Sequence, residues 1–131
     1  MADMERTEKI TINLSPVDLG QIDLLVQEGF YSNRTDLIRT AIRNQLTSHA
    51  EVVKQTVARK TMVLGLHHYT RQDLEAVKST GEKLQINVIG LVSIAEDVSA
   101  KLALATIDSI TVLGALRASP AVRAALAGRI K

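Results

Sequence analysis

The 131-residue sequence contains no cysteine and very few aromatic residues: two tyrosines, one phenylalanine and no tryptophan. Without cysteine the chain cannot form a disulfide, a thiolate metal site or a cysteine nucleophile, which fits a cytoplasmic protein. Hydrophobic residues still make up 46% of the chain. We therefore expect a core built from leucine, isoleucine, valine and alanine.

Long hydrophobic runs and enzyme motifs are also missing. No apolar run reaches the roughly 20 residues of a membrane-spanning helix, and the acidic N-terminus lacks the apolar stretch of a secretory signal. The sequence has no nucleophile elbow, phosphate-binding loop or dinucleotide fingerprint. We predict no enzyme activity, no cofactor and no membrane partner.

The charge is small and unevenly divided. The net charge is +2, but residues 1–50 carry five basic and seven acidic side chains, whereas residues 51–131 carry eleven basic and seven acidic ones. Bulk charge therefore cannot attract the N-terminal part to nucleic acid. Any binding of DNA there must depend on where individual groups lie.

Residues 9–14 alternate strictly between polar and apolar side chains, which predicts a strand. Lys9, Thr11 and Asn13 share its polar face. A helix is then expected from Ser15, a good N-cap followed by proline, to Gly29, a typical residue just past a helix end.

A second helix is predicted to begin at Asn33. Asn33 and Asp36 have the spacing of a capping box, with aspartate in place of the usual glutamate. No glycine or proline follows for many residues, so this helix can continue to about residue 59. A single strand cannot satisfy its own backbone hydrogen bonds, and about 45 residues cannot bury a sufficient core. The economical solution is a two-fold dimer with paired antiparallel strands.

The motifs KITINLS, Gly29-Phe30 and SNRTDLIRTAIR together resemble the ribbon-helix-helix regulators of the CopG/Arc/MetJ type, over residues 8–48. The resemblance implies that a two-stranded ribbon enters the DNA major groove. It implies that the base edges are read by Lys9, Thr11 and Asn13. It implies that a phosphate is held at the start of the second helix by Asn33, Arg34 and Thr35.

The arginines of the second helix have other interpretations as well. Arg34 can be an ordinary surface residue of that helix. Arg39 and Arg43 lie one turn apart, and we expect them in solvent rather than on DNA. The acidic residues of the first helix are expected to face mostly away from the DNA.

Residues 51–131 contain one pattern three times. Residues 63–66 (VLGL), 88–91 (VIGL) and 112–115 (VLGA) match at spacings of 25 and 24 residues, and each is followed by a helix start. Three strand–helix units predict a small α/β domain with a parallel sheet. The glycine in each copy indicates close approach of the backbone. We thus expect an α+β ribbon-helix-helix domain over residues 1–50 and a three-unit βα repeat domain over residues 51–131.

Such a sheet has two open edges, which predicts self-association of residues 51–131 into tetramers or larger assemblies. Parallel sheets bind ligands at the carboxyl ends of their strands. The candidate ligand residues at those ends are His68, Ser93 and Arg117.

Nickel-responsive regulators join the same DNA-binding domain to a metal-binding one. The candidates here would be His49, His67 and His68, but neighbouring residues of a strand point to opposite faces and no two histidines have a metal-binding spacing. We predict no metal site.

The sequence favours a sequence-specific transcriptional regulator, acting as a repressor. Three alternatives stay open: an antitoxin, a partition or nucleoid-organising protein, and an assembly protein that has lost DNA binding.

Overall fold

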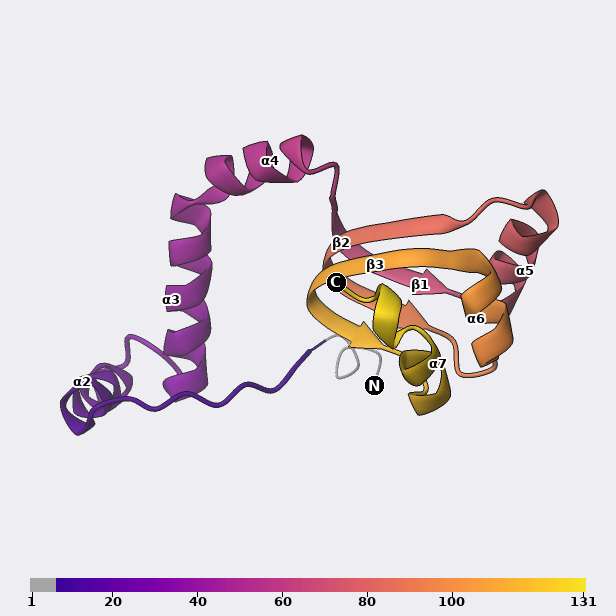
Figure 1. Cartoon of the computed structure of the whole chain (residues 1–131). Coiled ribbons are helices and arrows are strands. Elements are labelled where there is room, and N and C mark those ends of the chain that lie inside the picture. The colour runs from indigo at the N-terminus through magenta and orange to yellow at the C-terminus, as the bar shows by residue number, and fades with distance from the viewer. Residues whose placement is uncertain (1–6) are drawn as a thin grey trace. The chain divides into compact units, whose positions relative to one another are not determined.

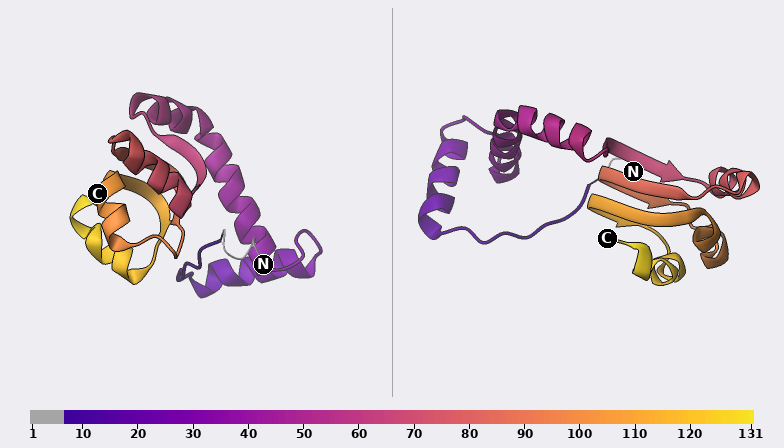
Figure 2. Two further views of the ribbon diagram at one scale, coloured as in Figure 1. Left: turned by 90° about the vertical axis from the view of Figure 1, so that its right-hand side faces the viewer. Right: turned by 45° about the horizontal axis from the view of Figure 1, so that its top comes forward.

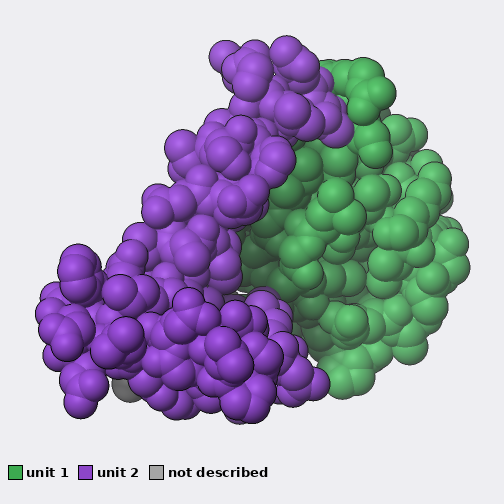
Figure 3. Space-filling view, turned by 90° about the vertical axis from the view of Figure 1, so that its left-hand side faces the viewer, with its two compact units in different colours: residues 1–6, 57–131 green, residues 7–56 purple. Residues whose placement is uncertain are grey.

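The computed structural model describes residues 7–131. They form two compact units, residues 7–56 and residues 57–131 (Figure 3). The boundary between the two units along the chain falls within helix α4 (Ala50–Arg59), whereas the sequence predicts a boundary after residue 50. Each unit is described by itself below.

The first unit contains the two predicted helices, α2 (Pro16–Gln27) and α3 (Arg34–Ser48). The hydroxyl of Ser15 accepts a hydrogen bond from the Asp18 N–H at 3.1 Å, as expected for the N-cap of α2. Gly29 follows the helix with φ +89°, a conformation that glycine adopts without steric cost. The N–H groups of Gly29 and Phe30 donate to carbonyls of the last turn, so the helix ends in a Schellman motif.

The predicted strand over residues 9–14 is not formed in the single chain. These residues have no regular secondary structure and run as an extended trace before α2 (Figure 1). The physical reason is that a strand needs a hydrogen-bonded neighbour, and the ladder expected here lies between two copies of the chain.

Two further expectations for the second helix need correction. The helix does not run unbroken to residue 59, because it stops at Ser48, is capped by His49 and resumes as α4. The capping box is also shifted by one residue. The Asn33 side chain accepts from the Asp36 N–H at 2.8 Å, but the Asp36 carboxylate accepts from the Ser32 N–H at 3.0 Å rather than from Asn33.

The second unit alternates strands and helices along the chain. Its elements are β1 (Val63–Tyr69), α5 (Arg71–Thr80), β2 (Leu84–Ile94), α6 (Ala100–Thr106), β3 (Ile107–Arg117), α7 (Pro120–Ala125) and the short 3-10 helix η1 (Ala127–Arg129). The strands form one parallel sheet in the order β1-β2-β3 (Figures 1 and 2). The predicted three-stranded parallel sheet is confirmed.

The register of the sheet aligns the three glycines that share the sequence pattern. Gly65 pairs with Gly90, and Gly90 pairs with Gly114. All three have positive φ, and a Cβ atom on Gly90 or Gly114 would overlap the carbonyl oxygen of the glycine on the preceding strand. The expected close approach of the backbone is therefore present, and it excludes a side chain at Gly90 and Gly114.

One face of the sheet carries the core. The helices α5, α6 and α7 each contribute to it, through Leu74, Leu102 and Val122 among others. They pack with alternate residues of β2, among them Val88 and Val92, which are at most 2% exposed. Side chains alternate along a strand, so the residues between these lie on the opposite face. In register, that outer face carries Leu64, Ile89 and Leu113, then Leu66, Leu91 and Ala115, then His68, Ser93 and Arg117.

The edge of β3 is partly covered, contrary to the expectation of two open edges. Ile130 forms a parallel bridge with Ile110, and the Lys131 N–H donates to the Ile110 carbonyl at 2.8 Å. This contact satisfies the first part of the edge, whereas the rest of β3 has no strand beside it among residues 7–131.

Candidate nucleic-acid interface and sheet-end pocket

The extended segment before α2 exposes both of its sets of side chains. Lys9, Thr11 and Asn13 are exposed, as contacts to DNA would require. Ile10 and Ile12 are exposed as well, at 74% and 56%. Exposure of apolar side chains to water is unfavourable. In the single chain, nothing among the described residues covers Ile10 and Ile12.

The same deficit extends over the whole first unit. Between residues 7 and 56 no side chain is buried, although Phe30 is 71% exposed and Leu46 is 60% exposed. By contrast, residues 57–131 bury twelve hydrophobic side chains. The apolar stripes of α2 and α3 therefore have no core of their own to pack on.

The start of α3 borders a hollow of about 300 Å³ lined by Asn33, Thr35, Asp36, Arg39 and Arg43. Two guanidinium groups and the first turn of a helix thus face the same space, against one carboxylate. The unpaired N–H groups and the positive dipole end of a helix start attract anions. The sequence assigned Arg39 and Arg43 to solvent, but the structure brings them to the residues expected to hold a phosphate.

Arg34 behaves differently from its neighbours. Its Nε and Nη2 donate to the two carboxylate oxygens of Asp23 in α2, at 2.7 and 2.8 Å. The hydrogen bond from Arg34 lowers the pKa of Asp23, and the same bond raises the pKa of Arg34. The Arg34 guanidinium joins α2 to α3 through Asp23. A phosphate that binds Arg34 would therefore have to share the guanidinium with Asp23 or displace the Asp23 carboxylate.

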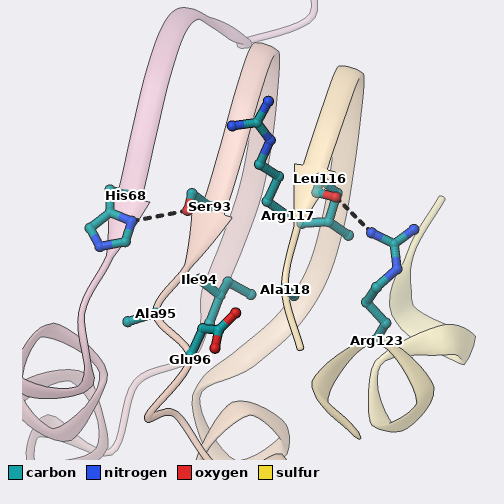
Figure 4. A pocket seen from close by; sticks show the side chains of 9 residues that line it. All are labelled: His68, Ser93, Ile94, Ala95, Glu96, Leu116, Arg117, Ala118 and Arg123. Atoms are coloured by element: carbon teal, nitrogen blue, oxygen red, sulfur yellow. Dashed lines mark hydrogen bonds between the residues drawn. The ribbon is translucent and has the colours of Figure 1, made fainter. Parts of the chain in front are cut away.

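At the other unit, the three candidate ligand residues lie together. His68, Ser93 and Arg117 occupy one row across β1, β2 and β3, and His68 Nδ1 lies 3.1 Å from the Ser93 hydroxyl. They line a pocket of about 660 Å³ at the carboxyl ends of the strands (Figure 4).

Residues beyond the three strands complete this pocket. Glu96 follows β2, and Arg123 reaches back from α7 to donate to the Leu116 carbonyl at 2.6 Å (Figure 4). Neither was predicted from the sequence. The contact from Arg123 to β3 depends on how α7 packs, which no spacing in the sequence indicates.

A capping box fixes the strand end beside His68. The Thr70 hydroxyl accepts from the Asp73 N–H at 3.1 Å, while the Asp73 carboxylate accepts from the Thr70 N–H at 2.9 Å. These hydrogen bonds to Thr70 lower the pKa of Asp73. Burial raises the pKa of the preceding Tyr69 hydroxyl. The start of α5, and with it the end of β1, is therefore held by paired polar groups.

Among residues 7–131 no three histidine, aspartate or glutamate side chains gather closely enough to hold a metal ion. None of the helices described there combines the length and hydrophobicity needed to cross a bilayer.

The first unit thus has the elements of a ribbon-helix-helix protein: an extended segment of alternating side chains, followed by two capped helices with uncovered apolar stripes. The chain belongs to the Ribbon-Helix-Helix transcriptional regulator family, whose model matches residues 5–123. It is therefore a member of a family of transcriptional regulators. The match extends well past the helix pair, so the family includes the sheet unit.

The chain is 40% identical over 43 residues to an uncharacterised protein of Methanocaldococcus jannaschii, an alignment that covers 33% of this chain and 44% of that relative. The chain thus matches less than half the length of that relative. No solved structure matches the chain.

Proposed function

We propose that this protein is a sequence-specific repressor that binds DNA as a dimer, through a two-stranded ribbon made from residues 9–14 of two copies. The single observation that carries the proposal is that residues 7–56 bury no side chain while exposing apolar side chains on all their elements. A second copy would pair with the extended segment and cover these side chains together. Burying them stabilises the dimer by about 25 cal/mol for each Å² of apolar surface.

Antiparallel pairing of the two segments assigns a direction to each set of side chains. With Ile10, Ile12 and Leu14 turned toward the four helices, Lys9, Thr11 and Asn13 project from the opposite face. A two-stranded ribbon fits the major groove. There the asparagine amide can pair with adenine, the lysine can donate to guanine, and the threonine methyl group can contact thymine.

The backbone of the DNA is held at the start of α3. Asn33, Arg34 and Thr35 remain the proposed phosphate contacts. The hollow that Asn33 and Thr35 border adds Arg39 and Arg43 to this set. These arginines supply positive charge to a domain whose overall charge is negative. Because Arg34 is engaged by Asp23, its contribution depends on whether phosphate replaces that carboxylate.

The sheet unit is proposed to join dimers into tetramers or larger assemblies. On its outer face, Leu64 and Leu113 are 63% and 59% exposed, in two rows of purely apolar side chains. A second sheet unit would bury these rows, and the edge of β1 and the part of the β3 edge that Ile130 and Lys131 leave open offer a further contact. Linking dimers in this way raises the effective concentration on neighbouring operator sites without new base contacts.

The two nearest alternatives make different demands on residues 57–131. An antitoxin usually binds its toxin through a tail that folds on binding, whereas these residues have a buried core of twelve hydrophobic side chains. A partition or nucleoid-organising protein would use the same ribbon and the same self-association over long arrays of sites.

Selection of DNA from a random pool, followed by the mass of the complex, tests the proposal. A repressor selects one short palindrome and binds it with an even number of protein chains. Selection of no common sequence would contradict the proposal, and selection of long tandem arrays would favour the partition role.

A further inference from the structure

The two outer strands of the sheet leave complementary lengths of backbone unpaired. β1 begins at Val63, which is in register with Val88 and, through it, with Val112 of β3. On β3, the bridge from Ile130 covers the edge at Ile110, two residues before Val112. In the described part of the chain, no strand covers β3 from Val112 onward. The open part of the β3 edge therefore begins where a second copy of β1 would begin if it continued the register of the sheet.

The glycine row of the sheet indicates the same continuation. A Cβ atom on Gly90 would overlap the carbonyl oxygen of Gly65, and one on Gly114 would overlap that of Gly90. Gly65 has a similar backbone conformation, with φ +148° compared with +138° and +123°. Yet a Cβ atom on Gly65 would meet nothing within 4 Å among the described residues. The open side of Gly65 thus corresponds to the side on which Gly90 and Gly114 each contact the preceding strand.

Val63 lacks the cover that its register partners have. The side chains of Val63, Val88 and Val112 share one row of the sheet. In this row Val88 is 2% exposed and Val112 packs against the core, but Val63, on the edge strand, is 49% exposed. A further strand beside β1, together with the helix that follows it, would bury an apolar side chain at this position.

We propose that the β3 edge of one copy pairs in parallel with the β1 edge of another, so that Gly114 lies beside Gly65 and the sheet continues from chain to chain. The contact repeats between copies the pairing that β1 makes with β2 and β2 makes with β3. It also brings Leu113 beside Leu64, which joins the exposed apolar rows of the two outer faces. This inference rests on the proposed self-association of the sheet unit and gives that association a geometry.

The proposed contact joins two different edges, so it is head-to-tail rather than two-fold. Each added copy leaves one β1 edge and one β3 edge free unless the assembly closes on itself. A contact of this kind builds rings or filaments. Dimers held together by their ribbons would therefore be linked into a series, with one continuous sheet along the assembly.

Gly65→Ala tests the contact, because the added methyl group meets nothing in the single chain but would overlap the Gly114 carbonyl oxygen of a neighbouring copy. In sedimentation over a range of concentrations, the full-length wild type should exceed the mass of a dimer, and Gly65→Ala should remain a dimer. Gly81→Ala is the matched control. It places the same methyl group at a positive φ, +76°, with nothing within 4 Å, but at the end of α5 rather than on an edge strand. It should assemble as the wild type does.

Introduced cysteines give a second measurement that does not depend on the glycines. The natural chain has no cysteine, so Leu64→Cys and Leu113→Cys each introduce a single thiol at an exposed position. In the proposed register these positions lie on adjacent strands, about 4.8 Å apart and within the range of a disulfide. Co-expression of the two variants and mild oxidation should give a mixed disulfide, whereas neither variant alone should form one. Leu64→Cys co-expressed with Leu104→Cys, which carries its thiol on α6, should not form one either.

The outcomes separate this contact from the wider proposal. A wild type that stays dimeric would contradict self-association itself and this contact with it. If the wild type assembles, assembly that Gly65→Ala leaves unchanged, or absence of the mixed disulfide, would overturn the edge pairing alone. A disulfide between two copies of Leu64→Cys would also overturn it, because that product requires a two-fold contact. If Gly65→Ala does not fold, the mixed disulfide decides.

Discussion

Gly90 lies so close to Gly65 on the neighbouring strand that a methyl group on Gly90 would overlap the Gly65 carbonyl oxygen. The same relationship links Gly114 to Gly90. Because the obstructing atom belongs to the backbone of a hydrogen-bonded strand, it cannot move aside as a flexible side chain would. At Gly90 and Gly114 the approach of the preceding strand therefore leaves no room for a side chain.

Gly90→Ala should accordingly destabilise the protein by about 3 kcal/mol, through overpacking and the strain of a positive φ. Gly128→Ala is the matched control, because a Cβ atom there meets nothing within 4 Å and the backbone is not strained. Its effect should stay within about 0.5 kcal/mol. Chemical denaturation of wild type, Gly90→Ala and Gly128→Ala measures the free energy of unfolding of each. Equal stability of wild type and Gly90→Ala would show that the strands can move apart without cost.

The capping box of α5 gives a second prediction about stability. Thr70→Ala removes the hydroxyl that accepts from the Asp73 N–H and should cost about 1 kcal/mol, as N-cap losses commonly do. Thr80→Ala, at the last residue of the same helix, is the comparison: it removes a hydroxyl that donates to the Val77 carbonyl at 2.7 Å and accepts from the Glu82 N–H at 3.3 Å, without touching the N-cap. Thermal unfolding should distinguish the two, and an unchanged transition for Thr70→Ala would rule out a stabilising cap.

Asp73 makes the contribution of this box dependent on pH. Its pKa is lowered by the hydrogen bonds with Thr70, so the folded state favours the ionised form. The stabilisation is complete above the usual aspartate pKa of about 3.9 and is lost as the pH falls through the lower pKa of the folded state. The stability difference between wild type and Asp73→Asn should therefore shrink below about pH 4. A difference that stays constant down to pH 2 would contradict this role.

Arg34 and Arg43 offer a comparison of phosphate contacts within one helix. If phosphate replaces Asp23 at Arg34, then Arg34→Ala removes two contacts from a dimer and should reduce the salt dependence of DNA binding by a slope of about two. Asp23→Asn should strengthen binding, since the competing carboxylate is gone. Arg43→Ala tests the hollow at the start of α3 in the same way. An unchanged salt slope for Arg34→Ala would limit Arg34 to joining α2 and α3.

If the outer face of the sheet joins dimers into tetramers, polar substitutions on that face should lower the mass of the assembly. Leu64→Gln combined with Leu113→Gln should convert tetramers into dimers in sedimentation equilibrium, because polar side chains cannot form an apolar contact between sheets. Leu104→Gln changes an exposed leucine of α6 instead and should leave the mass unaltered. Tetramers that persist in the double variant would exclude this face as the interface.

Local signals in the sequence predicted much of this structure. Ser15 and Asn33 each act as the N-cap expected from their position before a helix, because capping depends only on residues three apart. The parallel sheet followed from the spacing of the glycine patterns. His68, Ser93 and Arg117 met in one row because equivalent positions of parallel strands share a register.

The remaining features depend on contacts that no local pattern records. Arg34 and Asp23, which are eleven residues apart, join two helices, and the bridge from Ile130 to Ile110 depends on the path of the chain after α7. Arg123 entered the sheet-end pocket for the same reason. The strand over residues 9–14 could be predicted from alternation, but a single chain does not supply the neighbour that it needs.

The most direct test of the central claim compares wild type with a variant that combines Lys9→Ala, Thr11→Ala and Asn13→Ala, on DNA selected by the wild type. These changes leave the apolar residues of the segment intact, so both proteins should have the same oligomeric state in solution. The proposed ribbon predicts that the variant loses its preference for the selected sequence over random DNA, at about 1–3 kcal/mol for each base contact removed. Equal affinity and equal preference of the two proteins for the selected DNA would contradict it.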